Sequence, residues 1–160
     1  MVVTGMIKQF NMTREVLLKT IRTVSESEAN IIPKGFNNSL KWHIGHILFA
    51  ANLAFSIFQS TSYLPEQYIE WFKPGTGPKD WTNDIPTLNE LREQLEQQQA
   101  MVQEVFSDCL DQKLEKPFRV SNYGGHEFIT VSEMLNFFIF HESMHIGYIQ
   151  SIKLFIRAED

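Results

Sequence analysis

The chain has 160 residues, of which 43% are hydrophobic, with six Pro and eight Gly. This length and composition predict one globular domain over residues 1–160, with a core that needs no disulfide. The single cysteine, Cys109, excludes an internal disulfide and agrees with a reducing compartment. A formal net charge of −5 argues against nucleic-acid partners, because such proteins cluster Lys and Arg against phosphates.

Neither a membrane span nor a secretion signal is predicted. The longest mostly apolar run, Ile44–Phe58, carries polar residues and falls short of the roughly 18 residues that a spanning helix needs. The N-terminal segment lacks the basic start and apolar block of a signal peptide. We therefore expect a cytoplasmic protein with no membrane partner.

Four segments carry apolar residues at steps of three and four, the spacing of amphipathic helices. The third and fourth begin at capping boxes, Thr87 with Glu90 and Thr130 with Glu133. Because each segment is apolar on one side, the four helices most economically bury those sides against one another. The predicted fold is all-α, a four-helix bundle. Its helices are expected over residues 4–28, 40–57, 88–109 and 131–160.

The two connections at residues 60–86 and 114–129 are longer than a bundle usually has. Both contain several aromatic residues. In the second, Gly124-Gly125 predicts the tight turn of a small hairpin, because a Gly pair supports positive φ angles. We expect these connections to form lids or walls of a pocket.

Three of the five histidines lie on the inward sides of two predicted helices, His46 on the second and His141 and His145 on the fourth. Residues four apart lie on one helix face, so His141 and His145 can converge on one ion. A third imidazole would complete the set and leave a coordination position open to water, thiol or substrate oxygen. The alternative for any one of them is a core histidine that donates to a backbone carbonyl. A metal explains the stacked pair better, because each unpaired buried polar group costs about 1–3 kcal/mol.

The residues His141-Glu142-Ser143-Met144-His145 also match H-E-x-x-H, the helix motif of zinc peptidases. A peptidase is disfavoured, because Tyr148 and Ser151 occupy positions where one extended form of the motif needs Gly and His, and no strong strand precedes the helix. The E-x-x-H unit of di-iron bundles occurs only once, which favours a single-metal site.

Two residues near these histidines have more than one interpretation. Glu142 is a candidate catalytic proton acceptor for metal-bound water, or a solvated or inter-helix residue, because it lies about 100° around the helix from His141. His43 is three residues from His46, so either could face the bundle axis, or one could bind metal while the other forms a nearby hydrogen bond. We interpret His126 as an exposed loop residue and Cys109 as a buried, inert thiol.

The segment Trp42-His43-Ile44-Gly45-His46-Ile47, together with Phe140-His141-Glu142-Ser143-Met144-His145-Ile146-Gly147, resembles the DinB-like/YfiT-like family of small metal-binding bundles. The resemblance covers essentially the whole chain. It implies a four-helix bundle of DinB/YfiT type with long crossover connections, and three metal ligands at His46, His141 and His145, which favours His46 over His43. It also implies one divalent ion, typically nickel or zinc, and a homodimer.

The same resemblance implies a reaction class. Some relatives transfer the low-molecular-weight thiols bacillithiol or mycothiol or act as glutathione-type isomerases, and others resemble hydrolases. Many members continue the motif as His-Arg-Gly-Gln, whereas this chain has His145-Ile146-Gly147-Tyr148 and lacks those polar side chains.

The sequence as a whole predicts a metal-dependent enzyme that activates a thiol or water and presents it to a small electrophilic molecule. Thiol S-transfer with a low-molecular-weight thiol is the first choice, and hydrolysis the second. The alternative is a non-catalytic binding or structural protein in which the metal braces the helices. An open coordination position beside a pocket favours the enzyme, and a fourth protein ligand such as His43 or Glu142 favours the brace.

Overall fold

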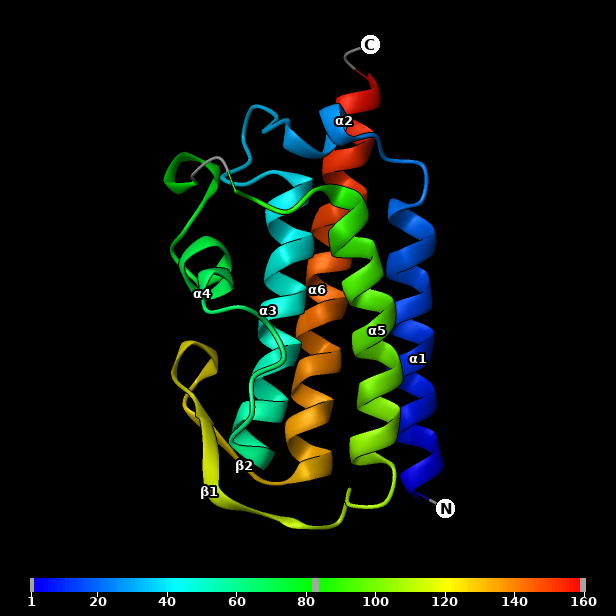
Figure 1. Ribbon diagram of the computed structural model, residues 1–160, viewed down its shortest axis with the longest axis vertical. Helices are drawn as coiled ribbons and strands as arrows, with labels where there is room; N and C mark the ends of the chain where they lie inside the picture. Colours follow the sequence, from blue (N-terminus) through cyan, green and yellow to red (C-terminus); the bar gives the residue numbers. More distant parts are fainter. Residues whose placement is uncertain (1, 82–83, 159–160) are drawn as a thin grey trace.

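The computed structural model describes residues 2–81 and 84–158. Four long helices run side by side along the long axis of the molecule, which confirms the predicted bundle (Figure 1). One short helix lies between the first two long helices, and a second short helix and a two-stranded antiparallel sheet occupy the two long connections, with single 3₁₀ turns at Pro78–Asp80 and Ser121–Tyr123. The long helices are α1 (Val2–Ile21), α3 (Leu40–Gln59), α5 (Leu88–Phe106) and α6 (Val131–Ala158), the short ones are α2 (Glu26–Asn30) and α4 (Gln67–Phe72), and the strands are β1 (Lys113–Val120) and β2 (His126–Thr130).

The predicted helix over residues 4–28 is wrong at its C-terminal end. Helix α1 stops at Ile21, and α2 starts separately behind Ser25. The Ser25 side chain accepts a hydrogen bond from the Glu28 N–H, and the Glu28 carboxylate accepts one from the Ser25 N–H at 2.7 Å. This capping box satisfies amide groups at the start of a new helix, and so favours a break over continuation. At the other end of the chain, the predicted continuation of the last helix beyond Ala158 lies outside the described residues.

The other predicted helix starts are confirmed. The Thr87 side chain accepts from the Glu90 N–H at the start of α5, and the Glu90 carboxylate accepts in return from the Thr87 N–H. Thr130 and Glu133 make the same two bonds ahead of α6. In the part of the chain that the structure describes, no helix is both long and apolar enough to cross a membrane.

The predicted hairpin is present as β1 and β2, with Phe118 opposite Phe128 and Val120 opposite His126. Gly124 and Gly125 form its turn with φ angles of 78° and 70°, values that residues other than glycine rarely adopt. The hairpin and α4 both lie on the α3 side of the bundle, away from α1 (Figure 1). The long connections therefore cover one side of the molecule.

Gly45 lets α4 pack closely against α3. A Cβ atom at this position would overlap the ring of Phe72, which is fully buried. The last turn of α4 therefore approaches α3 at the level of His46, one residue along from Gly45.

Candidate metal centre

His46 of α3 and His141 and His145 of α6 converge inside the bundle, with ligand nitrogens all within 4.8 Å of one another. Their exposed fractions are 5%, 8% and 9%. The Nε2 atoms of His46 and His141 lie 3.2 Å apart. Two nitrogens bound tetrahedrally to one ion at about 2.0–2.1 Å lie about 3.3 Å from each other. The arrangement therefore fits a divalent metal ion, and these three residues can hold one.

The surroundings keep these imidazoles neutral, which is the form that binds metal. Burial, reinforced by neighbouring histidines, lowers the pKa of His141 to about 4 and that of His145 to about 2. Burial also lowers the pKa of His46, although a hydrogen bond with the Phe72 carbonyl partly opposes it. At neutral pH each ring thus has one nitrogen lone pair available as a ligand.

The orientation of His46 is set by two neighbours. Its Nδ1 lies 2.5 Å from the backbone oxygen of Phe72, so Nδ1–H donates there and Nε2 is left with its lone pair toward His141. The Trp42 ring stacks on the imidazole, with centroids 4.7 Å apart and an interplanar angle of 10°. Contacts of this kind fix the tautomer and direction of a metal ligand.

His43 lies behind His145 and outside the group of three. Its Nδ1 is 2.9 Å from the Nδ1 of His145, and its ring stacks on Tyr148 with centroids 5.4 Å apart. In the tautomer in which the His145 Nδ1–H donates and the His43 Nδ1 accepts, the Nε2 of His145 keeps its lone pair for an ion. Of the open alternatives, the structure places His46 in the candidate site and His43 in a neighbouring hydrogen bond.

Glu142 forms a buried, two-pronged ion pair with Arg14 of α1. The Arg14 Nε donates to one carboxylate oxygen at 2.9 Å and Nη2 to the other at 3.0 Å. Arg14 also donates to Gln98 and to the Leu95 carbonyl of α5, and Gln98 donates to the Leu48 carbonyl of α3. The network links all four long helices. This is the inter-helix alternative for Glu142, and its role as proton acceptor stays a prediction.

A cavity of about 360 Å³ opens beside the histidines, with His46 and His141 among its lining residues. Phe118 and Tyr123 from the second long connection and Pro74 from the first contribute to its wall. The expectation that the long connections form walls of a pocket is confirmed for these residues. His126 is exposed, as expected, although it belongs to β2 and not to a loop.

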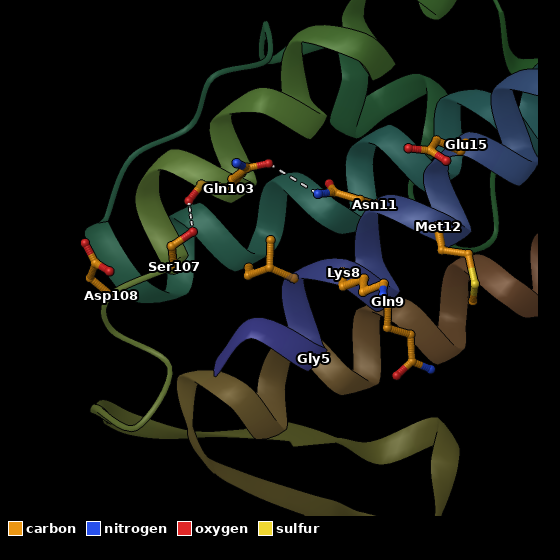
Figure 2. Close-up of a pocket in the computed structure, with 10 residues that line it drawn as sticks. Gly5, Lys8, Gln9, Asn11, Met12, Glu15, Gln103, Ser107 and Asp108 are labelled. Carbon is orange, nitrogen blue, oxygen red and sulfur yellow. Dashed lines mark hydrogen bonds between the residues drawn. The ribbon is translucent and has the colours of Figure 1, made fainter. Parts of the chain in front are cut away.

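A larger hollow of about 1030 Å³ lies between α1 and α5 and contains no histidine. Figure 2 shows Asn11 and Gln103 facing each other across it, where the Asn11 amide donates to Gln103 at 3.2 Å. Most of the residues that line it, including Lys8, Met12 and Glu15, are exposed. Exposed side chains are not held in place by packing as a reactive site requires, so the smaller cavity beside the buried histidines is the stronger candidate site.

Sequence reasoning missed two residues that shape this region. Arg14 stands in the middle of the apolar stripe of α1, between Phe10 and Leu17, and a charge at such a position signals a buried partner. No local sequence pattern indicates the contact between the Phe72 carbonyl and His46, because it depends on the packing of α4 on α3.

The sequence model of the family described as the DinB superfamily matches residues 9–149. The crystal structure of a conserved protein from Enterococcus faecalis aligns with a TM-score of 0.68 at 16% identity, covering 94% of this chain and 96% of that chain. At this identity the likeness concerns the fold alone. None of the curated proteins compared with the chain matches it.

Proposed function

Because the chain belongs to the DinB superfamily, and because three buried histidines meet beside a cavity, we propose that it is a metal-dependent enzyme. It binds one divalent ion, nickel or zinc, through His46, His141 and His145. It activates a thiol or water for attack on a small electrophilic molecule, with S-transfer of a low-molecular-weight thiol as the first choice. The observation that carries the proposal is the 3.2 Å approach of two neutral imidazoles that also line the cavity.

Neighbouring groups orient the histidines of the proposed centre. The Phe72 carbonyl and the Trp42 ring orient His46, and His43 orients His145. Burial excludes water from one side of the three rings, while the cavity admits the substrate. A divalent ion, when bound here, would lower the pKa of a thiol or water enough to supply a nucleophile near neutral pH.

His43 and Glu142 make hydrogen bonds to other side chains and are not placed as a fourth metal ligand, which supports an enzyme over a metal-braced structural protein. His43 contacts His145 through Nδ1, and both carboxylate oxygens of Glu142 accept from Arg14. Within residues 2–81 and 84–158, no fourth His, Cys, Asp or Glu joins the group of three. A three-histidine site of this kind leaves a coordination position for a reacting molecule. The homodimer stays a prediction, which sedimentation velocity tests.

Metal analysis of the purified protein tests the proposal. We expect one ion per chain in the wild type and its loss in His46→Ala and His145→Ala. The matched control is His126→Ala, which removes an exposed histidine on β2 and should retain the metal. The loaded protein is then assayed with thiols against electrophiles, and with the electrophiles in water alone.

Two results would count against the proposed function. Wild-type metal content in both His46→Ala and His145→Ala would show that the site is misassigned. Metal binding without any reaction of a thiol or water would favour the alternative, a non-catalytic protein in which the metal braces the helices.

A further inference from the structure

The cavity beside the histidines has walls that are mostly apolar. Helices α3 and α6 supply one side of it and the hairpin the other. Nine of the fourteen lining residues are apolar or aromatic, among them Leu53, Phe118 and Phe137, and Ser121 and Asn122 add uncharged polar groups at the hairpin tip.

Charge is nearly absent from this lining. Among its described residues there is no acidic side chain and no lysine. Arg119 is also among the lining residues, but its side chain is 66% exposed and its guanidinium is 3.8 Å from the Glu127 carboxylate. The inward neighbours Phe118 and Val120 are the hairpin residues that approach the bundle. A charged group placed against these apolar walls, away from the histidines, would therefore lose its water without gaining a partner.

The size and shape of the cavity restrict its occupant further. A volume of about 360 Å³ lies near the lower end of the roughly 300–1,000 Å³ typical of small-molecule sites, which indicates a compact occupant. The rings of Phe118 and Tyr123 lie 5.6 and 5.7 Å from that of Phe137, both in edge contacts. Aromatic rings at such distances accept another ring in offset or edge geometry.

We propose that the substrate of this site carries an uncharged aromatic or compact alkyl body that lies against Phe118 and Phe137. Its single reacting polar group is directed at His46 and His141, and any charged part stays outside the mouth. This inference rests on the proposed function, because it assigns the substrate class of the same metal centre.

Hydroxamates with different bodies test the inference, because they share one metal-binding head. The full chain is loaded with Co²⁺, and visible absorbance is followed during titration with acetohydroxamate, benzohydroxamate and 4-carboxybenzohydroxamate. Affinities are expressed relative to those for aqueous Co²⁺, which removes intrinsic differences between the heads. We expect benzohydroxamate to bind about tenfold more tightly than acetohydroxamate, from burial of the ring, and the added carboxylate to abolish this gain.

A pair of substitutions on α3 localises the effect. Leu53→Asn places an amide in the cavity wall, whereas Ile57→Asn places one a turn further along the helix, outside the lining. We expect only Leu53→Asn to lower the preference for benzohydroxamate. A preference that survives Leu53→Asn would overturn the placement of the ring in this cavity.

The remaining outcomes separate this inference from the proposed function. If Co²⁺ binds and acetohydroxamate and benzohydroxamate have equal relative affinities, the substrate class is wrong while the metal centre stands. If Co²⁺ does not bind, both proposals fail.

Discussion

The Nδ1 atoms of His43 and His145 lie 2.9 Å apart between α3 and α6. When the His145 Nδ1–H is the donor in this contact, the Nε2 of His145 keeps the lone pair that can bind an ion shared with His46 and His141. In the proposed centre, this contact would make His43 a positioning residue for His145, three positions before the candidate ligand His46 on its own helix.

We expect His43→Ala to lower the affinity for Zn²⁺ by about 10–100-fold, the usual effect of removing a partner that orients a ligand. His43→Asn should recover part of the loss, because its side chain can still hydrogen bond. Competition with a chromogenic chelator measures both affinities, and His126→Ala is the control. Equal affinity in His43→Ala and the wild type would show that the 2.9 Å contact does not orient His145 for metal.

Glu142→Gln should destabilise the protein by about 3–5 kcal/mol, because it leaves the fully buried Arg14 guanidinium without its counter-charge. Replacing both partners by apolar residues, Arg14→Met with Glu142→Leu, should recover much of this stability. Urea unfolding measures the free energies. Glu127→Gln at the exposed, 3.8 Å pair with Arg119 is the control and should cost less than about 1 kcal/mol. Unchanged stability of Glu142→Gln with lost turnover would instead support Glu142 as the proton acceptor.

Gly45→Ala should disturb the centre indirectly. The added methyl group overlaps the buried Phe72 ring, so α4 must move and carry the Phe72 carbonyl away from His46. We expect a loss of about 1–3 kcal/mol of stability, as for other overpacked sites, together with weaker Zn²⁺ binding. Gly147→Ala is the matched control, because that α6 glycine has no atom within 4 Å of the added position and alanine favours helix. Zn²⁺ affinity of Gly45→Ala equal to that of Gly147→Ala would contradict this role of Phe72.

Acid should weaken the contact between the start of α5 and the Glu26 carboxylate. Burial raises the pKa of Glu26, but hydrogen bonds from Lys41 and the Leu88 N–H and the charge of Lys41 outweigh it, so the pKa lies below 4.5. The ionised carboxylate therefore stabilises the fold above the unfolded pKa, and this contribution disappears as the pH falls through the folded pKa. Urea midpoints of the wild type and Glu26→Gln should differ at about pH 7 and converge near the folded pKa. A difference that grows toward acid would reverse the sign of this linkage.

The helices could be predicted because their apolar residues recur at helical spacing and their starts carry capping residues. The break after Ile21 was not predicted, because the stripe of α1 continues through Val24, and only the Ser25 and Glu28 pair marks a new start. The site could be predicted in part. His141 and His145 share a face by spacing alone, but the direction of His46 depends on α4, whose docking no local pattern encodes.

The tip of the hairpin shapes the cavity wall without contributing to the three-histidine group. This tip, residues 119–123, also contributes none of the fully buried core. Editing those few positions would remodel one wall while the helix packing and the histidines stay in place. A single scaffold can in this way be adapted to differently shaped molecules by changes confined to one surface ribbon.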